Sequence, residues 1–288
     1  MNTPLLTIAI PTYNRPHYLQ HCLEAICPQI DDNVEIVVRD NCSDNYDFFK
    51  FIEPYVSNYK VKAIKNDCNV GADANIARCF ELCKTQWLWV LGDDDCVLPS
   101  SIAKVLEVIK KENKTAFIKF NSLFTGRTVG INEFCSSMKH PYAFSNAYFI
   151  SEGVHNIGLT KKAMFWQYKY LSTNIGQILR IIKYIIENRD AECLFLSDPL
   201  LESHGENVSW THFELVYSFL YILDVFRPYK RLFRDNIFKC IVRLSFIYIR
   251  ESNLSFRDKL YYSFQVIYKY GLINSIRYSG KIILKMFV

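Results

Sequence analysis

The chain has 288 residues, which is enough to bury one large core or two smaller ones. Half of the residues are hydrophobic and 22% are charged, a composition that excludes an intrinsically disordered protein. The net charge is only +5, and residues 1–210 hold 21 Lys and Arg against 24 Asp and Glu, so this part lacks the basic surface of a nucleic-acid-binding domain.

Short apolar runs alternate with amphipathic segments along the first 120 residues. The runs are rich in β-forming residues and predict strands at 5–10, 34–40, 61–66, 87–92 and 116–120. Apolar residues spaced three and four apart predict helices that contain Leu19, Ile76 and Ile102. Strands that alternate with helices in this way form a mostly parallel sheet with helices on both faces. The sequence therefore predicts an α/β fold.

Polar residues follow three of these strands directly. They are Thr12, Tyr13, Asn14 and Arg15 after the first strand, Asp40 and Asn41 after the second, and Asp93, Asp94 and Asp95 after the fourth. Ligands of such sheets bind beyond the carboxyl ends of the strands, so we expect all three groups to lie along one edge. That edge is the predicted binding cleft.

The three consecutive aspartates repel one another unless a cation offsets their charge or one of them stays protonated. The oxygen-binding ions Mg²⁺ and Mn²⁺ suit carboxylates together with substrate phosphates, so the triplet predicts a metal site. The alternative is a strand-to-helix turn in which Asp93 or Asp95 caps the next helix. Ser100 or Ser101 suits that capping role at least as well. Both interpretations stay open at this point.

The polar residues lie in four segments, TIAIPTYNRPHYLQHCLEAI, EIVVRDNCSDN, NDCNVGADANIARC and WVLGDDDCVLP. In this order the segments resemble the inverting, nucleotide-sugar-dependent glycosyltransferases of the GT-A fold, in particular the large family 2-like group that builds bacterial surface polysaccharides. A later segment, DPLLESHGENVSW, is similar to the family's R-x-H-x-x-N-x-S pattern. The resemblance implies a GT-A domain over residues 1–210, with a nucleotide-binding half at 1–99 and an acceptor half at 100–210.

The resemblance also implies a nucleotide-binding site at the predicted edge. Its residues would be Pro11, Thr12, Tyr13, Asn14, Arg15, Asp40, Asn69, Gly71, Asn75 and Asp93. In the family, the aspartate at the end of the second strand contacts the nucleotide base, and Asp40 holds that position here. The base would stack near Tyr13. Ordinary core packing of Tyr13 is the alternative.

By the same resemblance, Mn²⁺ or Mg²⁺ would be held by Asp94, which matches the family's main metal ligand, with Asp93 or Asp95 beside it. His204 matches a histidine that can reach the metal or the diphosphate, although a lone histidine in a polar loop is otherwise a surface residue. One departure concerns Gly92, because the common family pattern has an aspartate there. Which pair of the three aspartates binds the metal is therefore open.

A second departure concerns the general base. Many relatives carry a Glu-Asp pair at a helix start, and its aspartate is the base. The matching position here falls near Thr173 and Asn174, neither of which is a base. Inverting transfer needs a group within hydrogen-bond reach of the acceptor hydroxyl. The candidates are Glu152, His155 and Asp95, and the sequence leaves the choice among them open.

Residues 211–288 form a basic, aromatic tail with 13 Lys and Arg against 5 Asp and Glu. Apolar spacing predicts several helices in this tail. Helices that combine basic residues with Tyr, Phe and Leu suit a membrane interface. The alternative is a helical subdomain that packs on the sheet, with its charges merely solvated. A membrane-side acceptor, such as a growing saccharide on a polyprenyl diphosphate, would give the tail a purpose.

Cysteine usage and the N-terminus predict where the protein is found. The ten cysteines form no CxxC pair and no zinc-ligand pattern, and Cys79 and Cys83 fall on one apolar helical stripe, so core thiols are expected. The N-terminal apolar run is short and lacks a basic flank, and no stretch reaches about 18 uninterrupted apolar residues. The chain is therefore predicted to be cytoplasmic and peripheral on the inner face of the cell membrane.

Together these features predict a metal-dependent, inverting glycosyltransferase with a nucleotide-sugar donor. Its acceptor would be a saccharide or a polyprenyl-diphosphate-linked chain in O-antigen or capsule synthesis, and no nucleic acid is expected as a partner. One rival is a degenerate, non-catalytic module that binds nucleotide or partner proteins, which the missing Glu-Asp pair motivates. A second is a nucleotidyltransferase, but no glycine- and basic-rich phosphate loop lies near the first strand.

Overall fold

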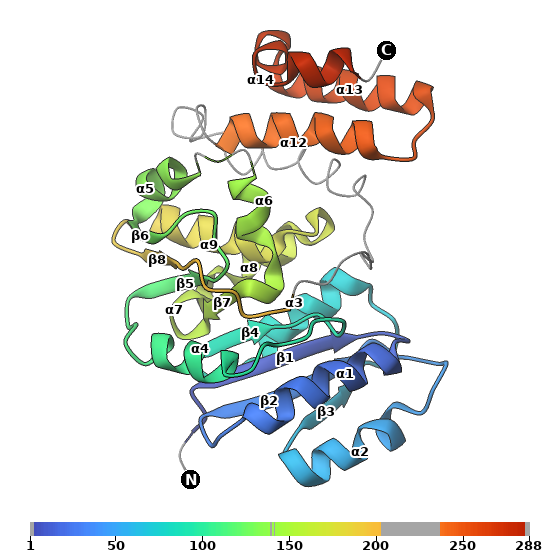
Figure 1. Cartoon of the computed structure of the whole chain (residues 1–288), viewed down its shortest axis with the longest axis vertical. Coiled ribbons are helices and arrows are strands. Elements are labelled where there is room, and N and C mark those ends of the chain that lie inside the picture. Colours follow the sequence, from blue (N-terminus) through green and yellow to red (C-terminus); the bar gives the residue numbers. More distant parts are fainter. Residues whose placement is uncertain (1–2, 139, 141, 203–236, 286–288) are drawn as a thin grey trace.

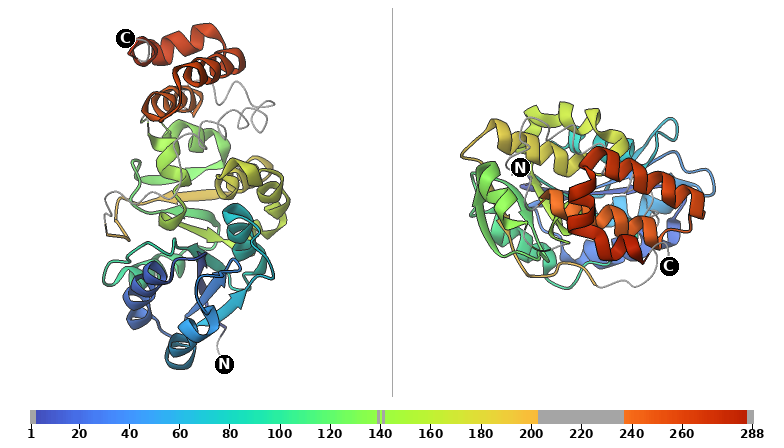
Figure 2. Two further views of the ribbon diagram at one scale, coloured as in Figure 1. Left: turned by 90° about the vertical axis from the view of Figure 1, so that its right-hand side faces the viewer. Right: turned by 90° about the horizontal axis from the view of Figure 1, so that it is seen from above.

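The computed structural model of the chain describes residues 3–138, 140, 142–202 and 237–285. The N-terminal strands of the sheet lie at one end of the molecule and the C-terminal helices at the other (Figures 1 and 2). The candidate metal ligand His204 and residues 203–236 lie outside the described residues.

The described strands form one eight-stranded sheet in the order β3-β2-β1-β4-β7-β5-β8-β6. They are β1 (Leu6–Thr12), β2 (Val34–Asp40), β3 (Lys62–Lys65), β4 (Trp87–Val90), β5 (Thr115–Lys119), β6 (Gly126–Val129), β7 (Gly153–Asn156) and β8 (Glu192–Phe195). Strands β3, β2, β1 and β4 are parallel neighbours, as are β5 and β8. Strand β7 runs antiparallel between β4 and β5, and β6 runs antiparallel beside β8. All five predicted strands are confirmed.

Three strands, β6, β7 and β8, are not predicted by the sequence pattern. Each has four residues, and β7 reads Gly-Val-His-Asn, which is poor in the β-branched and aromatic residues that mark strands. Pairing with β4 on one side and β5 on the other makes this segment a strand, so tertiary contacts decide its structure. The sheet is consequently parallel in its first half and mixed in its second.

Helices cover both faces of the sheet (Figure 1). They are α1 (Pro16–Ile26), α2 (Phe48–Tyr59), α3 (Ala72–Leu82), α4 (Ser101–Ile109), α5 (Gly130–Ser137), α6 (Ala143–Tyr148), α7 (Ile157–Thr160), α8 (Met164–Lys169) and α9 (Gly176–Glu187), with short 3-10 helices η1 (Cys27–Gln29), η2 (Ile150–Glu152), η3 (Lys161–Ala163) and η4 (Leu171–Thr173). Helices α1, α2 and α4 pack on one face, in a core with Ile8, Val38 and Trp89. Helix α3 packs on the other, where its Phe80 shares a core with Ala9. The predicted α/β fold is therefore confirmed.

The C-terminal helices are α12 (Ile237–Glu251), α13 (Phe256–Tyr270) and α14 (Leu272–Leu284), stacked beyond the second half of the sheet (Figure 2). Helix α12 packs into the body of the protein, because its Leu244 and Phe246 share a buried core with Leu179 of α9 and Phe195 of β8. The predicted C-terminal helical region is confirmed. Within the described part of the chain, every helix is too short or too polar to cross a membrane.

Candidate active site

The end of β1 and the loop after it contact the aspartates that follow β4. Thr12 Oγ1 donates a hydrogen bond of 2.7 Å to Asp93 Oδ2. Arg15 donates to Asp93 Oδ1 at 2.8 Å and to Asp94 Oδ2 at 2.7 Å, so one guanidinium bridges two carboxylates. Its planar set of donors suits two acceptor oxygens, and its charge offsets their repulsion. Arg15 is therefore a cation that stabilises the aspartate run.

The first two aspartates differ in their surroundings. Asp93 is buried, and both of its oxygens are engaged by Thr12 and Arg15. Burial raises the pKa of Asp93 to about 6, although the Thr12 hydrogen bond and the Arg15 charge oppose this rise. The side chain of Asp94 is 28% exposed, and only its Oδ2 contacts Arg15. Asp93 therefore positions Arg15, and Asp94 has an oxygen left for a ligand.

Two carboxylate oxygens converge beside Gly92. A Cβ atom at position 92 would lie 2.7 Å from Asp94 Oδ1 and 2.9 Å from Asp95 Oδ2, closer than Cβ contacts normally are. Asp95 Oδ2 also accepts a hydrogen bond of 2.7 Å from the Gly92 amide. A side chain at this position would displace the carboxylates. Asp94 Oδ1 and Asp95 Oδ2 thus both lie beside Gly92.

This convergence fits one side of a Mg²⁺ or Mn²⁺ site. Mg²⁺ is usually bound by one or two carboxylates, with waters and substrate phosphates as its other ligands. Among the described residues, no group of three or more His, Cys, Asp and Glu could hold an ion, so a donor diphosphate would have to complete the set. Neither Asp93 nor Asp95 caps the next helix, because α4 begins at Ser101 and Ser100 holds the N-cap position.

Asp40 ends β2 in register with Thr12 of β1, as the predicted edge requires. Its buried carboxylate accepts hydrogen bonds from the Ser43 amide at 2.8 Å and from the Ser43 hydroxyl at 2.5 Å. Ser43 Oγ in turn accepts a hydrogen bond of 2.8 Å from the Asn14 amide. Asp40 therefore connects the two loops at this edge. Tyr13 is 38% exposed on one of these loops, so its ring does not pack in the core.

Asparagine side chains connect the end of β2 to the segment before α3. Asn41 Nδ2 donates to Asn69 Oδ1 at 2.7 Å, and the same oxygen accepts from the Gly71 amide at 2.9 Å. Gly71 has a φ of +84°, a conformation that favours glycine. The buried Asn75 accepts a hydrogen bond of 2.8 Å from Asn66 Nδ2. The structure thus places Asn69 and Gly71 on the loop before α3 and Asn75 in α3 itself, and adds Asn66, whose position directly after β3 was the available signal.

Of the base candidates, Glu152 directly follows a residue that contacts the aspartate loop. Ser151 is the residue before Glu152, and its hydroxyl accepts a hydrogen bond of 3.2 Å from the Gly92 amide. Glu152 is buried, and its Oε2 accepts from Lys119 Nζ at 2.7 Å. Its Oε1 accepts from Asn121 Nδ2 at 2.6 Å. The carboxylate is therefore held in one orientation by a buried ion pair and an amide. Asp95 lies on the aspartate loop itself.

His155 lies in the core and not at the edge that carries the aspartates. Its side chain packs against Phe80 and Phe117, each with a ring centre 4.9 Å away, and the residue is 1% exposed. Its Nδ1 is 3.2 Å from a guanidinium nitrogen of Arg180. Burial and the Arg180 charge hold the pKa of His155 well below its usual value, so the ring is neutral. This placement gives an acceptor hydroxyl no access to His155.

We expect Glu152→Gln to reduce the free energy of unfolding by about 3 kcal/mol at pH 7, because it leaves Lys119 buried without its counter-charge. Burial lowers the pKa of Lys119 to about 8, although Glu152 opposes this shift. A lysine with a lowered pKa takes up a proton on unfolding between about pH 8 and its ordinary value of 10.5, so this group favours the folded state more as the pH rises. In Glu152→Gln the charge that opposes this shift is gone, so the pKa of Lys119 falls further, and the loss caused by the substitution should shrink as the pH rises towards 8 and be small above it.

Urea unfolding of both proteins at pH 6.5, 7.5 and 9 measures this loss. Glu107→Gln is the matched control, since Glu107 is an exposed partner of Lys111 and its replacement should change stability little at any of these pH values. A loss of the same size at pH 6.5 and pH 9 would contradict the buried ion pair as its cause.

The comparison with known families covers the part of the chain that carries this site. Residues 7–168, more than half of the chain, match the model of the family described as Glycosyl transferase family 2. The chain belongs to glycosyl transferase family 2. The resemblance inferred from the four sequence segments is thereby confirmed, and the site described above lies within the matched residues.

Curated relatives of this family 2 chain include bacterial proteins named as glycosyltransferases. It is 33% identical to the abequosyltransferase RfbV of Salmonella typhimurium over 103 residues, 34% of this chain and 31% of the relative. It is 32% identical to an uncharacterized glycosyltransferase of Haemophilus influenzae over 114 residues, 40% of this chain and 37% of the relative. The matches thus span about a third of the length of these relatives.

Solved structures of low sequence identity share the fold of this family 2 chain. Staphylococcus aureus TarS, residues 1–349, has a TM-score of 0.54 at 14% identity, with 96% of this chain and 73% of TarS covered. The mannosyltransferase PcManGT of Pyrobaculum calidifontis, solved in complex with GDP-Man and Mn²⁺, has a TM-score of 0.54 at 12% identity, with 99% and 88% covered. These likenesses support the GT-A architecture.

Proposed function

We propose that this family 2 glycosyltransferase moves a sugar from a nucleotide-diphosphate donor to a saccharide or lipid-linked acceptor, in a metal-dependent and inverting reaction. The observation that carries the proposal is the meeting of three groups at one edge of the sheet: the Thr12–Arg15 loop, Asp40, and the paired oxygens of Asp94 and Asp95. Relatives named abequosyltransferase and putative colanic acid biosynthesis glycosyl transferase support a role in surface polysaccharide synthesis, such as O-antigen or capsule.

The donor would lie across this edge. The exposed ring of Tyr13 would stack on the base, and Asp40 and the loop of Asn69 and Gly71 would enclose the nucleoside. A Mn²⁺ or Mg²⁺ ion held by Asp94 and Asp95 would offset the negative charge that develops on the leaving diphosphate. GDP-Man and UDP-GlcNAc, the donors in complexes of PcManGT and TarS, support the class of donor.

We assign the general base to Glu152 within this proposal. Ser151, the residue before Glu152, contacts the Gly92 amide, whereas the His155 ring is packed between Phe80 and Phe117. Glu152 would accept the proton of the acceptor hydroxyl while the oxygen attacks the anomeric carbon from the face opposite the diphosphate. Lys119 and Asn121 would hold the carboxylate in the orientation that this transfer needs.

Calorimetric titration of the diphosphates of uridine, thymidine, guanosine and cytidine, each with and without Mn²⁺, tests the donor site. We expect one nucleotide to bind at least about tenfold more tightly with the metal, because the diphosphate supplies ligands that the described residues lack. Incubation with the matching nucleotide-sugar should then release nucleoside diphosphate. Absence of binding with every base would favour a non-catalytic module, and release of inorganic diphosphate would indicate a nucleotidyltransferase.

We also propose that α13 and α14 bind the membrane that carries the acceptor. Both helices expose large apolar side chains, among them Phe264, Tyr268 and Ile273 at 66%, 82% and 80% exposure. Arg277 and Lys281 follow Ile273 at intervals of about one helical turn. Basic and exposed apolar side chains therefore share one side of α14. This combination suits insertion of apolar side chains among anionic lipid headgroups. A peripheral location on the inner face of the membrane stays a prediction.

We expect the protein to sediment with vesicles that contain anionic lipid, and the double variant Phe264→Asp, Ile273→Asp to bind them about tenfold to a hundredfold more weakly. Phe49→Asp is the matched control, since Phe49 is also exposed but belongs to α2, which lies at the other end of the molecule (Figure 1). The proposal fails if wild type ignores anionic vesicles, or if Phe49→Asp loses binding as strongly as the double variant.

A further inference from the structure

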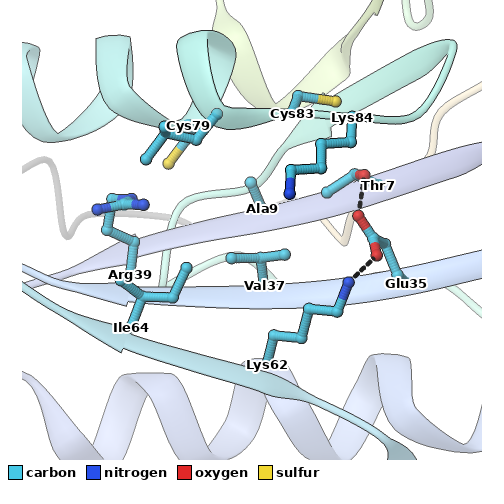
Figure 3. A pocket seen from close by; sticks show the side chains of 11 residues that line it. Thr7, Ala9, Glu35, Val37, Arg39, Lys62, Ile64, Cys79, Cys83 and Lys84 are labelled. Atoms are coloured by element: carbon cyan, nitrogen blue, oxygen red, sulfur yellow. Dashed lines mark hydrogen bonds and ion pairs between the residues drawn. The ribbon is translucent and has the colours of Figure 1, made fainter.

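A groove runs beneath α3 on the sheet face opposite α1 and α2. It has a volume of about 280 Å³, and its floor is formed by Ala9, Val37 and Ile64 of β1, β2 and β3. Cys79 and Cys83 line it from α3, and Figure 3 shows Arg39 at one end. The floor of the groove is apolar. Side chains of neighbouring strand residues point to opposite faces, so Arg39 points into the groove and Asp40, which belongs to the proposed donor site, points away from it.

Arg39 is a buried cation without an anionic partner in the part of the chain that the structure describes. The residue is 4% exposed, and its Nη1 donates a hydrogen bond of 3.1 Å to the neutral amide oxygen of Asn66. Its Nε has no hydrogen-bond partner within residues 3–138, 140, 142–202 and 237–285. Among the described residues, no carboxylate lies within ion-pair distance of this guanidinium. A buried charge is normally compensated by an opposite charge, so this end of the groove lacks an anion.

The other groups in the groove do not supply the missing charge. Burial raises the pKa of the Cys79 thiol to about 12, against the effect of Arg39, so the thiol is neutral. Glu35 lies near the opposite end, where it accepts a hydrogen bond of 2.8 Å from Thr7 and forms an ion pair with Lys62 (Figure 3). Among the residues that line the groove, Glu35 is the only one with a carboxylate, and it is already paired with Lys62.

We propose that this groove binds a small organic anion, with a carboxylate on the Arg39 guanidinium and an apolar body over Ala9, Val37 and Ile64. The guanidinium offers Nε and Nη donors in a plane, which suits the two oxygens of a carboxylate. The apolar floor favours an aromatic or branched body over an inorganic ion. This site is separate from the proposed donor site, because Asp40, the next residue, turns its carboxylate to Ser43 at the sheet edge.

Binding of 2-naphthoate, compared with its neutral amide, tests the proposal in full-length protein without metal. A metal bound at the aspartates could attract the anion, so the metal is omitted. We expect wild type to bind 2-naphthoate about tenfold more tightly than the amide, because a charged hydrogen-bonded pair forms only with the carboxylate. Arg39→Met should bind both compounds equally. Arg78→Met is the matched control, since Arg78 donates to the same Asn66 oxygen but does not line the groove, and it should behave as wild type.

A second variant keeps the test decisive if Arg39→Met does not fold. Val37→Phe keeps the guanidinium but places a ring in the groove, and it should lose 2-naphthoate binding while its thermal unfolding stays cooperative. A saturating nucleoside diphosphate should not displace the probe. Equal affinity of wild type for acid and amide, undiminished binding to Val37→Phe, or displacement of the probe by nucleotide would each overturn the proposal, whatever the outcome for the transferase activity.

Discussion

Asp94→Asn should lower the rate of glycosyl transfer by about three orders of magnitude and leave the fold intact. The substitution keeps the shape of the side chain but removes the negative charge that would hold the metal beside the leaving diphosphate. The side chain is partly exposed and its hydrogen-bonded partner is Arg15, so we expect stability to change by less than about 1 kcal/mol. Initial rates across a range of Mn²⁺ concentrations, together with thermal unfolding, measure both effects.

Asp198→Asn is the control for Asp94→Asn. Asp198 is an exposed aspartate that pairs with Lys104 at 3.2 Å, and the proposed mechanism gives it no part. The control should transfer sugar at the wild-type rate. Normal turnover by Asp94→Asn would show that the metal, if the enzyme needs one, is held elsewhere. Rescue of Asp94→Asn by high Mn²⁺ would instead support a weakened site.

Arg15→Met should lower both stability and donor binding, because Asp93 then stays buried without the cation that contacts it. We expect the free energy of unfolding to fall by about 2 kcal/mol, a partial effect since Arg15 itself is 27% exposed. Without Arg15, the carboxylates of Asp93 and Asp94 also lose their common partner, so their positions should change. Urea unfolding and the nucleotide titration report these two losses separately.

Arg15→Lys separates charge from geometry. A lysine keeps the positive charge but presents one nitrogen, so it cannot bridge two carboxylates as the guanidinium does. Stability should be largely retained, whereas donor binding should remain weaker than in wild type. If Arg15→Met is as stable as wild type and binds nucleotide as tightly, Arg15 does not organise the aspartates.

The edge of the sheet could be predicted because its signals are local. Apolar runs that end in polar residues mark the ends of β1, β2 and β4, and parallel strands place such ends side by side. Thr12 and Asp40 are accordingly in register, and Asp93 contacts Thr12. The roles of these residues in binding nucleotide or metal stay predictions.

Other features could not be predicted because they depend on contacts between distant segments. The sequence shows Arg15 as one of several polar residues after a strand, and nothing local indicates that its guanidinium bridges Asp93 and Asp94. His155 looks like a base candidate in sequence, but its strand β7 places the ring between Phe80 and Phe117. The pairing of Lys119 with Glu152 likewise joins residues from two elements.

Strand β7 also constrains the order in which the nascent chain can fold. The parallel half of the sheet, β3-β2-β1-β4, is complete in sequence once Val90 has been synthesised, but the free edge of β4 pairs with Gly153–Asn156. Until that segment leaves the ribosome, the apolar strand Trp87–Val90 presents unpaired backbone groups to other chains. Early intermediates should therefore be prone to edge-to-edge association, and chaperone binding during synthesis of residues 91–156 should matter more than after it.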